Sequence, residues 1–118
     1  MTNTKQDIER IRDEFQSCQQ ILAALGDETR QYLLFILLCG ECGGSRVADI
    51  AKKTNLSRPA VSHHIQILKN AGIVRARKEG RFIYYYLDPD DNEVQKIIDL
   101  FTDIRQIKKN APDRSGDE

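Results

Sequence analysis

Apolar residues recur every three or four positions over long stretches of the chain, which is the spacing of one face of an α-helix. The first stretch covers about the first 25 residues and ends at Gly26, and Asp27 is a suitable N-cap for a second helix through Leu38. A last stretch follows residue 91, where acidic residues favour a helix start. The apolar positions of the first stretch are Ile8, Ile11, Phe15, Cys18, Leu22 and Leu25. The apolar positions of the last stretch are Val94, Ile97, Ile98, Phe101, Ile104 and Ile107.

Residues 46–71 show two shorter helical patterns separated by a polar turn. The first begins at Val47, and the turn ends at Ser57, a residue that caps helix N-termini well. Pro59 is acceptable in the first turn of a helix, so the second helix should begin near Arg58, and Gly72 should end it. Two short helices joined in this way predict a helix-turn-helix.

The second of these helices has two different faces when its residues are placed about 100° apart. Val61, Ile65 and Leu68 fall together and are predicted to face the core. Hydroxyl, amide and imidazole groups lie on the other side, where they could hydrogen-bond base edges in a major groove. The residues predicted to contact DNA here are Ser57, Arg58, Pro59, Ala60, Ser62, His63, Gln66 and Lys69.

Residues 74–87 are rich in β-branched and aromatic residues and predict a hairpin, with strands over 74–78 and 81–87 joined at Glu79 and Gly80. Arg77, Lys78 and Arg81 place positive charge near its tip, where they could meet phosphates. Three consecutive tyrosines must alternate across a strand, and we expect Tyr84 to face the DNA. The fold class predicted is therefore mainly α with a small β-hairpin, a winged helix-turn-helix.

The charge distribution favours the same interpretation. The chain has 18 basic and 18 acidic residues, so its formal net charge is zero. Residues 45–81 nevertheless hold nine Lys and Arg against two Asp and Glu, whereas both flanking segments are acidic. A positive segment within a neutral chain suits a polyanionic partner. The alternative is an ordinary solvated charged surface.

The 118 residues suit one domain over 1–109, followed by a flexible polar tail over 110–118. The N-terminus does not resemble a secretion signal, and the longest apolar run, residues 32–39, is far below the roughly 20 residues that cross a bilayer. We expect a cytoplasmic protein without membrane contact. The terminal helices have more apolar surface than one small core needs, which favours a homodimer through them over ordinary internal packing. Two recognition helices related by a two-fold axis would bind an inverted repeat.

Four ordered motifs resemble the ArsR/SmtB family of bacterial repressors, over about residues 8–108. They are residues 25–30 (LGDETR), 56–65 (LSRPAVSHHI), 68–74 (LKNAGIV) and 80–87 (GRFIYYYL). The resemblance implies a homodimeric winged-helix repressor that binds a double-stranded operator and is released by a metal or another inducer. Residues that match the family's DNA-contacting helix are Ser57, Arg58, Ala60, Ser62 and His63, and those that match its wing are Arg77, Lys78 and Arg81.

The chain departs from the metal-sensing members of that family. Many of them have Cys-Val-Cys where this sequence has Arg46-Val47-Ala48, and no histidine follows His64 to join Asp99 and Asp103 in a site on the last helix. Carboxylates without imidazole partners make a poor zinc site. We therefore expect no metal and no other cofactor, and the inducer is unknown.

Cys39 and Cys42 have the C-x-x-C spacing of thiol redox pairs and zinc knuckles. The alternatives are a thiol or redox sensor, a metal site completed by other ligands, or a small buried Cys39 beside an incidental loop thiol. Cys18 is predicted to pack. A small thiol oxidoreductase is disfavoured because the motif follows an apolar helix and not a strand, and a winged-helix module that binds protein is the other alternative to a DNA-binding regulator.

Overall fold

The computed structural model describes residues 3–40, 43–88 and 92–111 and is mainly helical, with one antiparallel hairpin. This confirms the predicted fold class. The predicted tail lies outside the described residues from 112 onward. The elements are α1 (Lys5–Leu25), α2 (Glu28–Cys39), α3 (Val47–Lys53), α4 (Arg58–Asn70), β1 (Arg75–Glu79), β2 (Phe82–Tyr86) and α5 (Asn92–Asn110).

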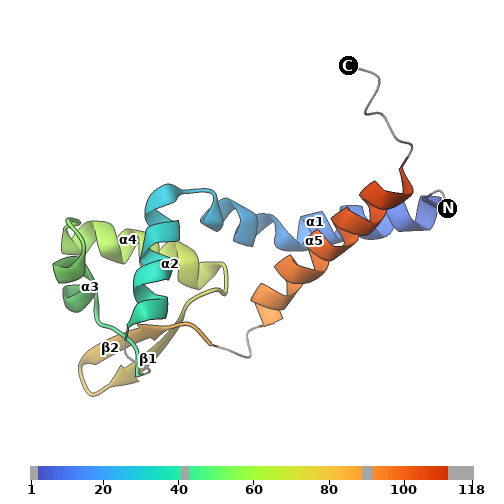
Figure 1. Cartoon of the computed structure of the whole chain (residues 1–118). Helices are drawn as coiled ribbons and strands as arrows, with labels where there is room; N and C mark the ends of the chain where they lie inside the picture. Colours follow the sequence, from blue (N-terminus) through green and yellow to red (C-terminus); the bar gives the residue numbers. More distant parts are fainter. Residues whose placement is uncertain (1–2, 41–42, 89–91, 112–118) are drawn as a thin grey trace.

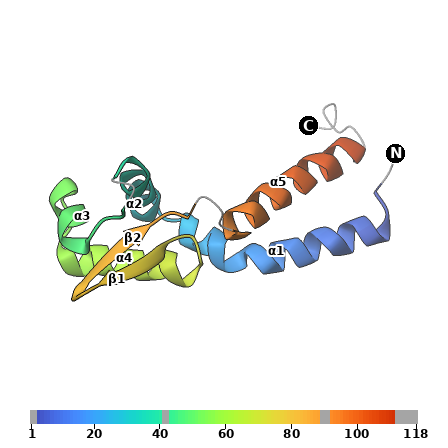
Figure 2. The same ribbon diagram turned by 90° about the horizontal axis from the view of Figure 1, so that it is seen from below.

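The molecule has a body and an arm (Figure 1). Helices α2, α3 and α4 and the β1–β2 hairpin, hereafter the wing, form the body. Helices α1 and α5 lie antiparallel beside each other and form the arm, whose far end holds the start of α1 and the end of α5 (Figure 2). There the Asn3 side chain donates a 3.0 Å hydrogen bond to the Ile107 carbonyl. The arm gives the molecule extents of 56 × 30 × 20 Å.

Local capping fixes where the first two helices begin and end. Thr4 and Asp7 form a capping box at the start of α1, and Gly26 ends that helix as predicted. The carboxylate of Asp27 then accepts a 3.0 Å hydrogen bond from the Arg30 backbone N–H at the start of α2. This confirms the predicted cap, and the abrupt change of direction lets α1 leave the body while α2 remains in it (Figure 1).

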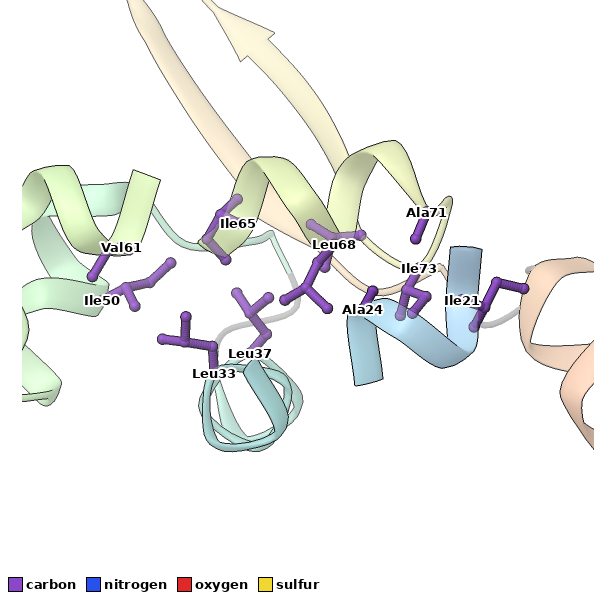
Figure 3. Packing of buried hydrophobic residues seen from close by; sticks show 11 residues of the cluster. Ile21, Ala24, Leu33, Leu37, Ile50, Val61, Ile65, Leu68, Ala71 and Ile73 are labelled. Carbon is purple, nitrogen blue, oxygen red and sulfur yellow. The ribbon is translucent and has the colours of Figure 1, made fainter. Parts of the chain in front are cut away.

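The core is formed where α2, α3 and α4 meet the last turns of α1 (Figure 3). Leu33 of α2, Ile50 of α3 and Val61 of α4 are fully buried in it, and each such side chain contributes about 1.5–3 kcal/mol through burial. Ile21 and Ala24 of α1 belong to the same cluster. The helix-turn-helix is thus anchored to the base of the arm.

The turn of the wing differs from the prediction by one residue. Glu79 pairs with Phe82, so the two-residue loop is Gly80-Arg81 and not Glu79-Gly80. Gly80 has φ of +60°, which suits the first position of such a loop, whereas a turn centred one residue earlier would require a positive φ at Glu79. Arg81 therefore occupies the tip, and Arg77 lies opposite Tyr84, two pairs away from Glu79.

The apolar stripe predicted on α5 is divided into two faces. Leu100, which the prediction omitted, is the fully buried residue of α5, and Ile97, Ile104 and Ile107 are half-buried on the same side. Val94, Ile98 and Phe101 are exposed on a neighbouring side. Part of the stripe is exposed because α1 covers one face of α5 only, in agreement with the surplus of apolar surface predicted for the terminal helices. No helix in the described residues is long and apolar enough to cross a membrane.

Candidate nucleic-acid interface

Helix α4 begins where the sequence predicts. The Ser57 Oγ accepts a 3.2 Å hydrogen bond from the Ala60 backbone N–H, and Pro59 lies in the first helical turn. The predicted inner side chains, Val61, Ile65 and Leu68, are buried. These contacts fix the rotation of α4 about its axis and so determine which of its side chains face solvent.

The opposite side of α4 is open to solvent, as predicted, and its residues are hereafter the outer face of α4. Ala60 is half-buried at the edge of this face. The Gln66 amide donates a 2.9 Å hydrogen bond to the Asn70 side chain, and the His63 ring contacts the His64 ring edge-on with centroids 5.4 Å apart. The exposed residues of the face are Arg58, Pro59, Ser62, His63, Gln66 and Lys69, with Ser57 exposed just before them.

His64 is half-buried and its Nδ1 lies 3.3 Å from the Arg30 Nη1. His64 therefore links α4 to Arg30 of α2, and His63 is the histidine that lies on the outer face of α4.

The wing presents its predicted basic residues in two ways. Lys78 and Arg81 are exposed, with Arg81 in the turn. Arg77 is exposed too, but its guanidinium is engaged within the chain: it donates a 2.7 Å hydrogen bond to the Gly43 carbonyl, pairs with Glu79 at 3.0 Å, and lies over the Tyr84 ring. Arg77 and the half-buried Tyr84 thus form a contact that joins the wing to the segment before α3.

A hollow of about 400 Å³ lies between the start of α3, the outer face of α4 and β2. Three arginines and Ser62 line it, and none of the acidic residues that the structure describes does. Of these three arginines, Arg46 was not among the residues predicted to contact DNA. The only feature that could have indicated it is its position immediately before the first helix of the helix-turn-helix. The lining residues are Arg46, Val47, Ala48, Arg58, Ser62, Arg81, Phe82, Ile83 and Tyr85.

Both acidic residues of the basic segment are paired within the chain. Asp49 lies 3.3 Å from Arg46, and Glu79 lies 3.0 Å from Arg77. Exposed pairs of this kind contribute little and exchange readily. The outer face of α4, the hollow and the wing tip therefore form one surface of predominantly positive charge, which suits the phosphates of a duplex.

Comparison with known proteins agrees with this geometry. The model of the family described as bacterial regulatory protein, arsR family, matches residues 27–76, from the cap of α2 into β1. The arsenical resistance operon repressor of Escherichia coli is 36% identical over 93 residues, which are 78% of each chain. The chain belongs to the ArsR family.

Two further relatives are similar to this chain over most of its length. An uncharacterized HTH-type transcriptional regulator of Methanocaldococcus jannaschii is 38% identical over 92 residues, covering 78% of this chain and 99% of that protein. The solution structure of a homodimeric winged helix-turn-helix DNA-binding domain from Mycobacterium bovis, a possible ArsR-family regulator, has a TM-score of 0.56 and 25% identity, covering 90% and 91% of the chains. The chain is therefore a DNA-binding transcriptional regulator, and its family is one of regulators and not of enzymes.

The cysteines of this regulator lie in different surroundings. Cys18 is buried on α1, as predicted, and burial raises the pKa of its thiol, which lowers its reactivity. Cys39, at the end of α2, is exposed, so the interpretation of a small buried residue is wrong for it: the helix ends at the surface. Cys42 lies outside the described residues. Among the described residues, no three His, Cys, Asp or Glu side chains form a group that could hold a metal.

Proposed function

We propose that this ArsR-family regulator is a homodimeric repressor whose two copies of α4 bind the half-sites of an inverted-repeat operator. The observation that carries the proposal is the outer face of α4, which is exposed and polar while the opposite face fixes the helix in the core. Such a face fits a major groove. We also propose that the protein is cytoplasmic, because a repressor must reach the chromosome, which lies in the cytoplasm in bacteria and archaea such as the sources of its relatives.

The exposed apolar side of the arm supports the homodimer. Phe15 of α1 and Ile98 and Phe101 of α5 are 44%, 51% and 54% exposed, although they belong to helices that already pack on each other. An apolar hollow of about 340 Å³ continues this side toward Phe35 and Leu38 of α2. We propose that a second copy covers it, since a two-fold interface joins identical surfaces and the Mycobacterium bovis domain is homodimeric.

The predicted site residues take two roles in this proposal. Side chains at the middle of the outer face contact base edges, and cationic or hydroxyl side chains at its ends and on the wing contact the phosphate and sugar backbone. Arg77, whose side chain is 42% exposed, and Tyr84 beneath it are assigned to the backbone group. The base-edge group is Pro59, Ala60, Ser62, His63 and Gln66, and the backbone group is Ser57, Arg58, Lys69, Arg77, Lys78, Arg81 and Tyr84.

We propose that thiol chemistry at Cys39 and Cys42 releases the operator and that no metal is needed. The exposure of Cys39 supports access of an oxidant, and Gly40, the next residue, lies against the Ser45 side chain just before α3. The test is operator affinity under reducing and oxidising conditions for the wild type and for a variant with Ser at both positions. A response of the wild type alone supports the sensor, and equal responses contradict it.

The experiment for the main proposal is selection of bound sites from a pool of random duplexes by the full chain. We expect an inverted repeat whose half-sites lie about one helical turn, roughly 10–10.5 base pairs, or a multiple of it, apart. Transcription in vitro from a promoter that contains the selected site should fall when the protein is added. Enrichment of a single unrepeated half-site would contradict the dimer, and a rise in transcription would contradict repression.

A further inference from the structure

We propose that Arg46 belongs to the DNA-binding surface, where it binds a backbone phosphate in the hollow between α3, α4 and β2 and positions the wing through Phe82. This inference rests on the proposed contact of α4 and the wing with a duplex. It assigns a role to a residue outside the outer face of α4 and outside the basic residues of the wing.

The first observation is the stack around Phe82. The guanidinium of Arg46 lies 4.6 Å from the centroid of the Phe82 ring, and that of Arg81 lies 5.4 Å from the same centroid. Phe82 is the first residue of β2 and is 41% exposed. Cations over an aromatic face are attracted by its quadrupole. The ring therefore holds one arginine from the α3 side and one from the wing tip next to each other.

The second observation is that the backbone on both sides of this stack is fixed. Ser45, just before Arg46, forms an isolated bridge with Tyr85 of β2, with hydrogen bonds of 2.9 and 2.8 Å in the two directions. Ser45 is buried. The segment that enters α3 is thus attached to the wing by its backbone at Tyr85 and by a side chain at Phe82. A change in the Arg46 contact should alter the angle at which the wing meets the duplex.

The third observation is the chemistry of the hollow. Arg46 lines it from just before α3, Arg58 from the start of α4 and Arg81 from the turn of the wing, and none of the described carboxylates lines it. A guanidinium carries five N–H donors in a planar fork that suits phosphate oxygens. The Arg46 Nε lies 3.3 Å from Asp49, and this side chain remains 35% exposed, so the terminal nitrogens can still meet a ligand. Three such groups around one hollow match a backbone phosphate beside the major groove.

The test compares Arg46→Gln with Arg46→Lys, using a selected operator and a scrambled duplex of equal length over a range of salt concentrations. Arg46→Gln removes the charge and should weaken binding to both duplexes alike, and should reduce the slope of log K against log salt by about 0.9. Arg46→Lys keeps the charge, so its slope should match the wild type. Phe82→Leu should weaken binding with no change in slope, because it removes the stack and no charge.

The matched control is Arg75→Gln. Arg75 lies at the other end of β1, pairs with Asp88 at 3.2 Å, and does not line the hollow. It should keep the wild-type slope, and circular dichroism should show that all four variants fold. A normal wild-type slope that Arg46→Gln leaves unchanged would overturn the phosphate contact, and wild-type affinity in Phe82→Leu would overturn the positioning role. Wild-type binding without any salt dependence would instead overturn the proposed function, and this inference with it.

Discussion

The Nη1 of Arg30 lies 3.3 Å from the Nδ1 of His64, so a side chain in the first turn of α2 touches the helix that carries the proposed DNA-contacting face. The same guanidinium donates to the carbonyls of Ala24 and Ala23, at 2.7 and 3.4 Å, at the end of α1. The Arg30 side chain is 15% exposed. One residue thus connects the base of the arm to α2 and α4.

Replacing Arg30 by Met should reduce the free energy of unfolding by about 1–3 kcal/mol, because the carbonyls of Ala23 and Ala24 lose their donor in a partly buried place. Urea unfolding at a fixed protein concentration measures this. The control is Arg12→Met on an exposed part of α1, which should change stability by less than about 0.5 kcal/mol. Equal effects of the two substitutions would show that the contacts of Arg30 do not stabilise the junction.

Stability should also depend on a carboxyl pair inside the arm. A hydrogen bond to Asp103, together with burial and the charge of Asp103, raises the pKa of Glu14 from its ordinary 4.5 to about 7, against the opposing charge of Arg10. Between pH 4.5 and about pH 7 the folded state therefore binds more protons than the unfolded state. The stabilisation that protonated Glu14 gives to the folded state is complete below pH 4.5 and is lost as the pH rises through about 7.

The Glu14→Gln variant tests this dependence, because its amide stays neutral. We expect the difference in unfolding free energy between Glu14→Gln and the wild type to grow in favour of the variant from about pH 4.5 to about pH 7. Glu9→Gln, on an exposed part of the same helix, is the control and should follow the wild type. A constant difference over this range would show that Glu14 ionises in the folded protein as it does in the unfolded chain.

Replacing Ser62 or His63 by Ala should reduce discrimination between the operator and a random duplex by about 1–3 kcal/mol for each lost base contact. Both side chains are exposed on the outer face of α4, so neither change should disturb the core. Competition binding at one salt concentration measures the ratio of the two affinities. Lys5→Ala, at the far end of the arm, should leave the ratio unchanged; a wild-type ratio in both α4 variants would remove this face from base recognition.

A carboxylate introduced by Phe101→Glu should dissociate the proposed homodimer, because the charge would be buried against the apolar side of the partner's arm. Sedimentation velocity should show a monomer at concentrations where the wild type is a dimer. Gln106→Glu adds the same charge to an exposed position of α5 that lies outside the apolar side, and should remain dimeric. Unaltered dimers of Phe101→Glu would place the interface elsewhere.

Local chemistry made much of the fold predictable. Ser57 and Asp27 cap the helices predicted for them, because a short polar side chain can satisfy the free N–H groups of the first turn without help from distant residues. The inner face of α4 followed from periodicity alone. The turn at Gly80 was misplaced by one residue, since a glycine can take either position of a two-residue loop and the pairing of Glu79 with Phe82 decides between them.

Features that depend on contacts between distant segments could not be predicted in the same way. Leu100 is buried because α1 covers that side of α5, and the α5 sequence alone shows only that several faces are apolar. Arg46 lines the hollow because the Ser45–Tyr85 bridge brings it to Phe82, a residue 36 positions later in the chain. The residues next to Arg46 in the sequence do not indicate its contact with Phe82.

The most direct test of the account is a salt titration of the wild-type protein on its selected operator and on a scrambled duplex of the same length. We predict that binding to both duplexes weakens steeply with salt, because the protein neutralises the backbone phosphates of either duplex in the same way. We also predict that the operator is bound at least about 10³-fold more tightly than the scrambled duplex at physiological salt. Equal affinities for the two duplexes, or binding that salt does not affect, would contradict the claim that the outer face of α4 and the wing together recognise a DNA sequence.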